Sequence, residues 1–444
     1  MSATHSVEPD THDPPPSLLM IAPHFVPEPT VAGLRVSYWA HYLVERGCHV
    51  TVVVPRRIGP LPDLDDEDLP WLADLRILEL PMPPPLPFSA TTPGRRPGVR
   101  RARRELVGVV GTPFVPDRQQ GYWESTLPLI RPLAEAMAPT AVLTTSPPHS
   151  LHLIGRDLKR RFHIPWIADL RDPYLDDTRF SPKGMVGSLM RGRHEAFERS
   201  IYTEADLVVH AIQGHFAKAR REFPGRAQHL RYVPNGFPDE MLDLPTGPTR
   251  SLNDAVRLVS AGVSGPRELA IVADAIDNFG SREPTIEMRI CGPSPNDPAN
   301  RSRARSQVLY LGHLHHRRAL QEIMSADVLL AALSVERSKV GGCSSKLYEY
   351  MATGRPIVVI NPTREDEHLL TTNYDWFTIL RQPSSAQVED ALRAAIRRVA
   401  QQGAPVEVRP TVERVRRVFR RSNGAEELFE ELQDLALPLA KRAR

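Results

Sequence analysis

Short apolar runs alternate with helical patterns along most of the chain. Residues 17–23 form the first run, a helical pattern ending near Gly47 follows, and residues 49–55 form a second run. Short apolar runs bounded by proline or glycine are typical of buried parallel strands. Further strands of the first half are expected at residues 75–80, 141–145, 165–170, 207–211 and 230–233.

The same alternation resumes after residue 253. Residues 386–401 predict a long helix with one apolar face, because Val388, Leu392, Ala395 and Val399 recur at helical spacing. The strands expected in this half are residues 257–262, 286–291, 308–311, 328–333 and 356–360. Strands that alternate with helices predict a parallel sheet covered on both faces.

We therefore expect an α/β protein of two doubly wound, Rossmann-like domains. They cover residues 17–236 and 254–410, and residues 237–253, rich in proline and glycine, form the linker. In such folds ligands bind outside the carboxyl ends of the strands, so a central cleft between the two sheets is the expected site. Residues 1–16 predict a disordered tail, and residues 411–444 predict one or two helices.

Composition narrows the class of protein. The 444 residues carry 56 Lys and Arg against 53 Asp and Glu, a balance that argues against a nucleic-acid binder. The three cysteines lie far apart, which predicts neither a disulfide framework nor a zinc site and fits a reducing, cytoplasmic compartment. The apolar runs are too short for a membrane-spanning helix, and the first residues lack the pattern of a signal peptide.

Residues 81–116 do not fit the alternating pattern. A proline cluster precedes six arginines within ten residues: Arg95, Arg96, Arg100, Arg101, Arg103 and Arg104. One interpretation is a solvated insertion. The other is a basic amphipathic patch that contacts an anionic membrane or a phosphate-bearing acceptor.

Two segments contain candidate nucleotide-binding residues. Gly33 lies between the first strand and its helix, where glycine lets backbone N–H groups approach an anion, although a purely structural turn explains it equally well. The second segment holds Gly341, Gly342, Ser344, Ser345, Lys346, Leu347 and Glu349. Its small residues precede a predicted helix, an arrangement suited to phosphate oxygens.

Lys346 and Glu349 project from one face of that predicted helix because they are three residues apart. A cation for a diphosphate and a carboxylate for a ribose diol would together hold a nucleotide. The alternative is a surface ion pair that contributes only ~0.2–0.5 kcal/mol.

The segment from Lys346 to Pro356 resembles the K-x-x-E-Y-x-A-x-G-x-P signature of the retaining glycosyltransferases of family 4, which have the GT-B fold. Residues 233–236 resemble the family's I-P-N-G turn, residues 308–312 its V-x-F-L-G strand, and the loop with Gly33 its glycine loop. Residues 146–149 and 167–173 resemble the S-P-P and D-L-R-D segments of members that act in surface-polysaccharide assembly or antibiotic biosynthesis.

The resemblance implies sugar transfer, with retention, from a nucleoside-diphosphate sugar to a hydroxyl or amine acceptor, without a metal ion or other cofactor. Glu349 would bind the ribose, while Lys346, Arg267 and loop amides would bind the diphosphate. Asp172, Arg171 and His149 are the catalytic candidates of the first domain, with Asp172 or the leaving phosphate as the base. The acceptor stays open: a saccharide, a lipid-linked molecule or a small metabolite. The resemblance also implies that the last helix crosses back to the first domain.

This sequence departs from the family pattern at three positions. Gly341 stands where the family has the first of two glutamates, Arg171 where many members have histidine, and Arg267 is the remaining candidate cation after Gly262. A sugar-nucleotide epimerase and a non-catalytic nucleotide-sugar-binding subunit are the alternative functions, and the loss at Gly341 favours the latter.

Overall fold

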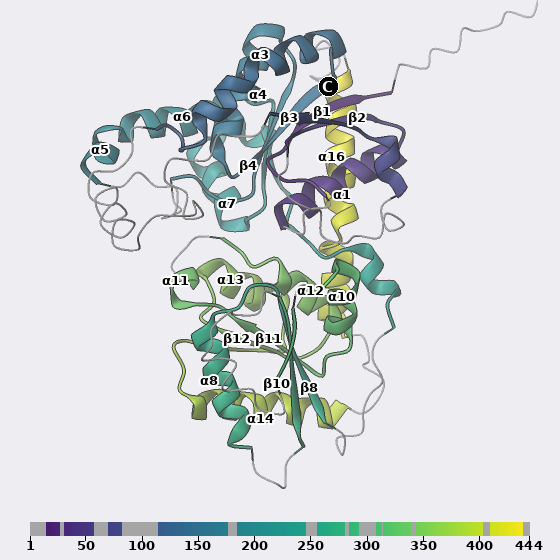
Figure 1. The fold of residues 1–444 in the computed structure, drawn as a ribbon, viewed down its shortest axis with the longest axis vertical. Coiled ribbons are helices and arrows are strands. Elements are labelled where there is room, and N and C mark those ends of the chain that lie inside the picture. Colours follow the sequence, from purple (N-terminus) through teal and green to yellow (C-terminus); the bar gives the residue numbers. More distant parts are fainter. Residues whose placement is uncertain are drawn as a thin grey trace, which may run out of the picture.

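The computed structural model describes residues 15–26, 31–56, 70–81, 114–175, 184–245, 255–279, 284–292, 308–312, 314–338, 342–402 and 409–437. Over these residues the chain forms two α/β domains, one above the other in Figure 1. Each domain has a parallel β-sheet between layers of helices, as the alternating pattern predicts.

The strands of the first domain run in the spatial order β3-β2-β1-β4-β5-β6-β7, all parallel. The sheet consists of β1 (Ser17–Ile21), β2 (His49–Pro55), β3 (Arg76–Leu80), β4 (Ala141–Ser146), β5 (Trp166–Leu170), β6 (Leu207–His210) and β7 (Leu230–Tyr232). The helices between these strands are α1 (Val31–Glu45), α3 (Gln120–Met137), α4 (His152–Phe162), α5 (Gly184–Leu189), α6 (Arg191–Glu204) and α7 (Gln213–Glu222). Short 3₁₀ helices are η2 (Pro70–Asp74), η3 (His149–Leu151) and η4 (Pro224–His229).

The second domain repeats this plan with the strand order β10-β9-β8-β11-β12-β13. Its strands are β8 (Val256–Ala261), β9 (Ile286–Cys291), β10 (Val308–Gly312), β11 (Val328–Ala332), β12 (Ile357–Ile360) and β13 (Phe377–Leu380). Its helices are α8 (Pro266–Asp277), α10 (His316–Met324), α11 (Val335–Ser338), α12 (Lys346–Thr353), α13 (Arg364–Asn373) and α14 (Ser385–Gln402).

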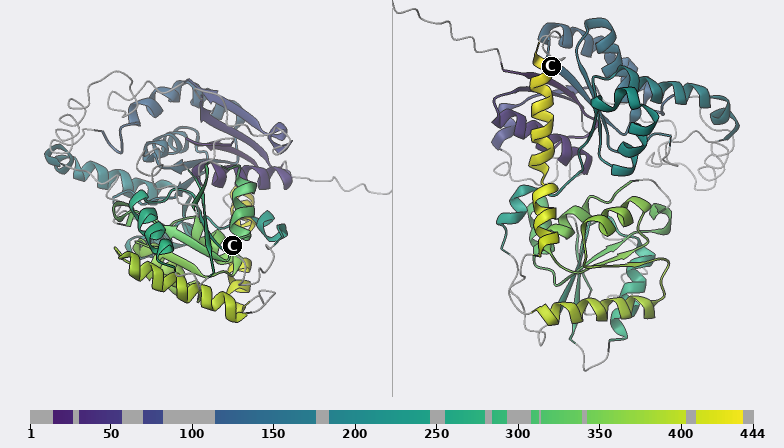
Figure 2. Two further views of the ribbon diagram at one scale, coloured as in Figure 1. Left: turned by 60° about the horizontal axis from the view of Figure 1, so that its bottom comes forward. Right: turned by 180° about the vertical axis from the view of Figure 1, so that it is seen from behind.

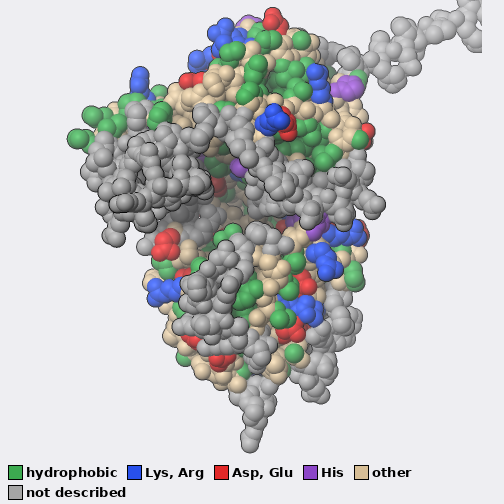
Figure 3. Space-filling model, viewed as in Figure 1, with side chains coloured by type: hydrophobic (Ala, Val, Ile, Leu, Met, Phe, Trp, Pro, Cys, Tyr) green, Lys and Arg blue, Asp and Glu red, His purple; other side chains and the backbone are tan. Residues whose placement is uncertain are grey.

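Both sheets reverse their strand order once. In the first domain β1 pairs with β2 on one side and β4 on the other, and in the second domain β8 pairs with β9 and β11. The connections leave such a point in opposite directions, which opens a crevice at the carboxyl ends of the two central strands. The face shown in Figure 3 is hollowed where the two domains meet.

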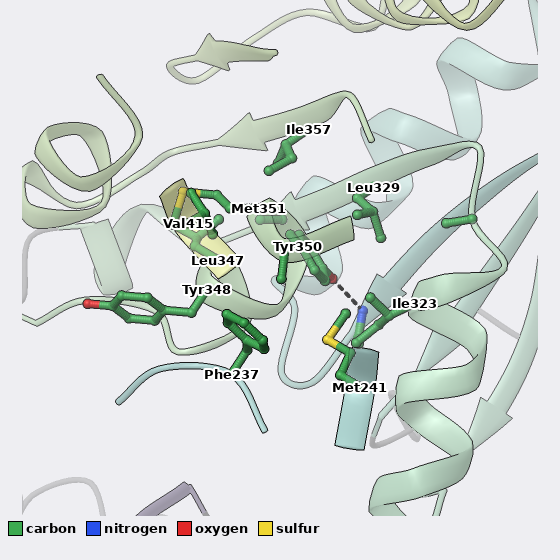
Figure 4. Packing of buried hydrophobic residues seen from close by; sticks show 14 of the residues in the cluster. Phe237, Met241, Ile323, Leu329, Leu347, Tyr348, Tyr350, Met351, Ile357 and Val415 are labelled. Atoms are coloured by element: carbon green, nitrogen blue, oxygen red, sulfur yellow. Dashed lines mark hydrogen bonds between the residues drawn. The ribbon is translucent and has the colours of Figure 1, made fainter. Parts of the chain in front are cut away.

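Buried apolar side chains cover both faces of each sheet. In the second domain's core Tyr350 and Met351 of α12 lie near Leu329 of β11 and Ile357 of β12, whereas the Tyr348 side chain points away from these strands (Figure 4). The buried Tyr350 hydroxyl accepts a hydrogen bond from the Ala261 amide (2.8 Å) and donates one to the Leu330 carbonyl (3.2 Å). These two bonds fix α12 against the carboxyl ends of the central strands β8 and β11.

The segment expected to be a linker is partly a structural element. Residues 239–243 form the 3₁₀ helix η5 (Asp239–Asp243), and Phe237 and Met241 are fully buried in the second domain's core. The sequence pattern missed this because two apolar side chains in a proline-rich segment show no periodicity. Residues 246–254, the rest of the linker, lie outside the described residues.

The chain ends in two helices that lie along both domains (Figure 2, right). The first, α15 (Pro410–Val418), buries Val412 and Val415 in the core of the second domain. The second, α16 (Arg421–Ala436), buries Leu428 and Leu432 in the first domain's core, against α1. Between them Phe237 and Arg420 form a parallel bridge that joins the linker to the C-terminal segment.

Some features expected from the sequence lie outside the described residues: most of the tail, residues 82–113 with the six arginines, and Gly341. In the described part of the chain, no helix is long and apolar enough to cross a membrane.

Candidate functional site

The two sheets point their carboxyl ends toward each other, and contacts cross between them. The Gly214 amide at the start of α7 donates a hydrogen bond to Glu365 Oε2 at the start of α13 (3.3 Å). Tyr232, the last residue of β7, lies close enough to Tyr348 on α12 for each tyrosine to affect the pKa of the other. These contacts join α7 and β7 of the first domain to α13 and α12 of the second.

The second domain contributes Lys346 and Glu349 from the first turn of α12. Both residues are 9% exposed, so they form no ordinary surface ion pair. Lys346 Nζ donates a hydrogen bond to the Val263 carbonyl in the loop after β8 (3.1 Å). Lys346 therefore spans from α12 to the loop at the sheet-reversal point.

The environment of Glu349 has opposing effects on the ionisation of its carboxyl group. Burial raises the pKa of Glu349 above its ordinary value, whereas the charges of Arg421 and Lys346 lower it and that of Glu240 raises it. Arg421, the first residue of α16, places Nη2 3.3 Å from Glu349 Oε1. The carboxylate thus faces two cations from different helices.

The loop before α12 is held by the helix that follows it. Asp366 is fully buried and accepts hydrogen bonds from the amides of Ser344 (2.6 Å) and Thr363 (3.0 Å), while the Thr363 hydroxyl donates to the Gly342 carbonyl (2.8 Å). Amides of this loop were expected to bind a diphosphate; the Ser344 amide is hydrogen-bonded to the Asp366 carboxylate. Ser345 precedes α12 without a side-chain capping bond among the described residues.

The loop after β8 approaches the backbone of a neighbouring strand closely. Gly262 adopts φ +75°, and its carbonyl oxygen would lie 2.5 Å from a Cβ atom at Gly292. Position 292 therefore needs glycine for close packing, whereas position 262 favours glycine because of its positive φ. Arg267 follows in the first turn of α8, where it is exposed. The structure does not bring Arg267 into contact with Lys346 or Glu349 in the described residues.

The first domain has a buried ion pair at its own sheet-reversal point. Arg35 on α1 is 4% exposed and contacts both carboxylate oxygens of Asp169 on β5, which is fully buried (3.4 and 3.0 Å). Its guanidinium also donates to the carbonyls of Val233 and Pro234 (2.9 and 3.0 Å), and Asp169 accepts a further bond from the Thr145 hydroxyl. This network ties α1, β4, β5 and the 233–236 turn together.

Gly33 lies within α1, two residues after its start, and is buried. It was expected in the loop before the helix. The first turn of a helix tolerates glycine well, since its N–H groups have no partner within the helix.

Arg171 is bound by the loop that follows β4. Its Nε donates to the Thr145 hydroxyl and the Ser146 carbonyl (both 3.1 Å), and its Nη2 donates to the Pro147 carbonyl (3.1 Å). Burial lowers the pKa of Arg171 somewhat, but the group stays charged near neutral pH. Arg171 therefore fixes the shape of residues 145–147.

His149 and Asp172 lie next to each other, as the sequence interpretation places them in one region. His149 is fully buried, packs on the Tyr174 ring (4.8 Å between centroids) and has Nε2 3.3 Å from the Asp172 carbonyl oxygen. The contact uses the backbone of Asp172, not its carboxylate. Behind Asp172 lies a cavity of about 20 Å³, which is space for about one water molecule and not for a sugar.

Three residues that shape this region were not expected from the sequence: Arg35, Arg421 and Asp366. The capping pattern of Thr363 followed three residues later by Asp366 is a local signal that could have found Asp366. Arg35 and Arg421 give no local signal, because their partners lie 134 and 72 positions away. Among the described residues, no three His, Cys, Asp or Glu side chains come together in a group that would hold a metal ion.

A family model matches the first domain. Residues 32–236 match the model of a glycosyl transferase 4-like domain. A comparison with curated protein sequences gives no match.

Solved structures match almost the whole chain. Sucrose-phosphate synthase from Thermosynechococcus elongatus superposes with a TM-score of 0.57 at 15% identity, over 95% of this chain and 99% of that one. WaaG, a glycosyltransferase involved in lipopolysaccharide biosynthesis, gives a TM-score of 0.56 at 14% identity, over 94% and 99%. UGT71G1 of Medicago truncatula, complexed with UDP-glucose, gives 0.55 at 11% identity, over 94% and 98%.

Proposed function

The first domain is a glycosyl transferase 4-like domain and the whole chain has the GT-B fold, and from this premise we propose that the protein transfers a sugar from a nucleoside-diphosphate sugar. The acceptor is a hydroxyl or amine, and the anomeric configuration is retained. The observation that carries the proposal is the buried pair Lys346 and Glu349 on one turn of α12, at the reversal point of the second sheet.

The donor binds to the second domain in this proposal. The Glu349 carboxylate accepts hydrogen bonds from the ribose hydroxyls, and Lys346 neutralises diphosphate charge. Negative charge grows on the departing diphosphate in the transition state, so a cation fixed in advance near it lowers the barrier. Arg267 is exposed at the start of α8, so its contact with a diphosphate requires that its side chain turn toward the loop after β8.

The acceptor binds to the first domain. Asp172 lies after β5, beside the loop that Arg171 holds in shape, and is the candidate base for the acceptor proton. Transfer of that proton to a diphosphate oxygen is the other route. His149 is buried against Tyr174 and contacts the Asp172 backbone, which suits a positioning role better than direct contact with substrate.

The comparisons support the donor class only in general terms. UGT71G1 was solved with UDP-glucose, and WaaG acts in lipopolysaccharide biosynthesis. At 11–15% identity this similarity concerns the fold.

A ligand screen tests the proposal. Thermal unfolding with UDP, GDP, dTDP and their sugars should reveal one nucleotide that raises Tm, because a ligand that binds only the folded state stabilises it by mass action. Glu349→Ala and Lys346→Ala should each remove that shift and lower transfer about 100-fold or more while the protein remains folded. Unchanged binding and transfer in both variants would disprove the assignment.

A non-catalytic nucleotide-sugar-binding subunit is the second candidate, and Gly341 favours it. This position has no carboxylate, whereas the resembling family has glutamate there. Donor binding without transfer or hydrolysis, followed by activity on addition of a partner protein, would identify this function.

A further inference from the structure

The C-terminal helix α16 contributes a charged side chain to the region of α12. Arg421, its first residue, and Glu349 have side chains that are 9% and 12% exposed, and Nη2 lies 3.3 Å from Oε1. The two residues are 72 positions apart. Such a shielded pair interacts more strongly than an exposed one, because water screens it less.

The backbone around Arg421 is fixed from several sides. The Arg421 amide donates a hydrogen bond to the Phe237 carbonyl, and the Phe237 amide donates to Phe419 (3.0 and 2.9 Å). The next residue, Ser422, donates from its amide and its hydroxyl to the Asp239 carboxylate, which also accepts a bond from the Tyr38 hydroxyl of α1. Arg421 is thus presented to Glu349 from a rigid junction of the linker, α1 and α16.

The charges around the Glu349 carboxylate come from three elements. Lys346 on its own helix and Arg421 on α16 favour the ionised form, and Glu240 on η5 disfavours it. His316, the first residue of α10, faces Arg421, and burial lowers the pKa of His316 to about 3. His316 is therefore neutral near pH 7 and adds no charge, so Arg421 and Lys346 are the cations that act on Glu349.

We propose that Arg421 is a positioning residue of the nucleotide site, which holds the Glu349 carboxylate in the orientation and charge state that binds the ribose hydroxyls of the donor. This inference rests on the proposed function. It assigns to the C-terminal helix a part in donor binding, although that helix packs on the other domain. An ionised carboxylate offers two acceptor oxygens to a diol, whereas a protonated one offers fewer acceptor sites.

The test measures nucleotide affinity as a function of pH. UDP, GDP and dTDP are titrated calorimetrically from about pH 5 to about pH 8 into the wild type and into Arg421→Gln and Arg421→Lys. The control variant is Arg417→Gln, which changes an exposed arginine of α15. Arg421→Gln should bind the preferred nucleotide ~10-fold more weakly near pH 7, since a hydrogen bond to a charged group contributes on that order.

The pH profile separates a positioning role from a purely structural one. Without Arg421 the pKa of Glu349 rises further, so affinity in Arg421→Gln should fall at a higher pH than in the wild type. Arg421→Lys should restore most of the wild-type profile, and Arg417→Gln should match it. An Arg421→Gln variant with lower Tm but the wild-type affinity and profile would overturn the proposal.

A double variant tests the role of Arg421 if Arg421→Gln does not fold. The double variant Glu349→Gln/Arg421→Gln removes both charges of the pair, so that neither charge is left buried without its partner. Its nucleotide affinity should equal that of Glu349→Gln alone. A double variant that binds at least 10-fold more weakly would show that Arg421 acts independently of Glu349.

The failure of this inference differs from the failure of the proposed function. If the wild type binds none of the nucleotides, both are wrong. If the wild type binds one and Glu349→Gln weakens it while Arg421→Gln does not, the function stands and the role of Arg421 is wrong.

Discussion

The backbone amide of Ser344 donates a hydrogen bond to the carboxylate of Asp366 across 2.6 Å. The same carboxylate accepts the Thr363 amide and so completes the capping box at the start of α13. One buried side chain therefore closes a helix end and holds the loop that leads to Lys346. The shape of the proposed donor site depends on α13, which contributes none of the binding residues predicted from the sequence.

Replacement of Asp366 by alanine should lower both stability and nucleotide affinity. Asp366→Ala leaves the amides of Ser344 and Thr363 without their acceptor, and an unsatisfied buried group costs about 1–3 kcal/mol. We expect a loss of about 2–4 kcal/mol in urea unfolding, on the same principle. Glu367→Ala, which removes a surface ion pair with Arg381, is the control and should cost at most about 1 kcal/mol. Equal losses in the two variants would contradict this role.

Loss of one partner of the buried Arg35–Asp169 pair should be costly. Asp169→Ala leaves the Arg35 guanidinium buried with only backbone carbonyls as acceptors. Breaking a buried pair in this way costs about 3–5 kcal/mol. The double variant Arg35→Met/Asp169→Ala should lose less than the sum of the two single changes, and denaturant unfolding measures all three. Strict additivity would show that the two residues do not interact.

Acidification should destabilise the protein in part through His210. This histidine is 1% exposed, and burial lowers its pKa to about 3, whereas the unfolded chain binds the proton near pH 6.5. The unfolded state therefore takes up the proton first as pH falls, and stability is lost from about pH 6.5 downward. His210→Phe should flatten the pH dependence of the free energy of unfolding between about pH 6 and pH 4.

The control for this pH experiment is His368→Phe, a change at an exposed position of α13. It should leave the slope of unfolding free energy against pH near that of the wild type. Identical slopes in the wild type and His210→Phe would refute the role of His210 in acid sensitivity.

Truncation of a buried leucine in α16 should weaken the first domain. Leu432 is fully buried with residues of α1, β1 and β2, whereas Leu437, just past the helix, is 36% exposed. Leu432→Ala should cost about 2–5 kcal/mol, the usual range for a buried leucine. Leu437→Ala should cost under about 1 kcal/mol. Similar losses, measured by thermal unfolding, would mean that α16 is not part of this core.

Much of the architecture follows from local sequence pattern. The apolar runs at residues 17–23, 49–55 and 328–333 predict strands that the structure contains, within two residues at each end. The GT-B fold was likewise expected from the resemblance, and the structural comparisons confirm it. The linker was less predictable, because Phe237 and Met241 enter the core without a periodic pattern.

The candidate site contains contacts that the local sequence pattern does not predict. Residue spacing placed Lys346 and Glu349 on one helical turn, which the structure contains, and the roles of these residues remain proposals. Ser344 was expected in a loop whose amides bind a diphosphate, and the carboxylate that its amide contacts belongs to a residue 22 positions further along, in another helix. Spacing predicts neighbours within one element but not which element packs against it.

The sequence by itself determined most of the strands and helices, their parallel arrangement and the residue types on the first turn of α12, since these depend on periodicities of a few residues. Only the tertiary structure decided that Arg421 meets Glu349 and that Arg35 meets Asp169. Both contacts arise because the chain returns, after many residues, to the carboxyl ends of its sheets. The charge state of a buried carboxylate depends on these distant partners, and therefore on the complete fold.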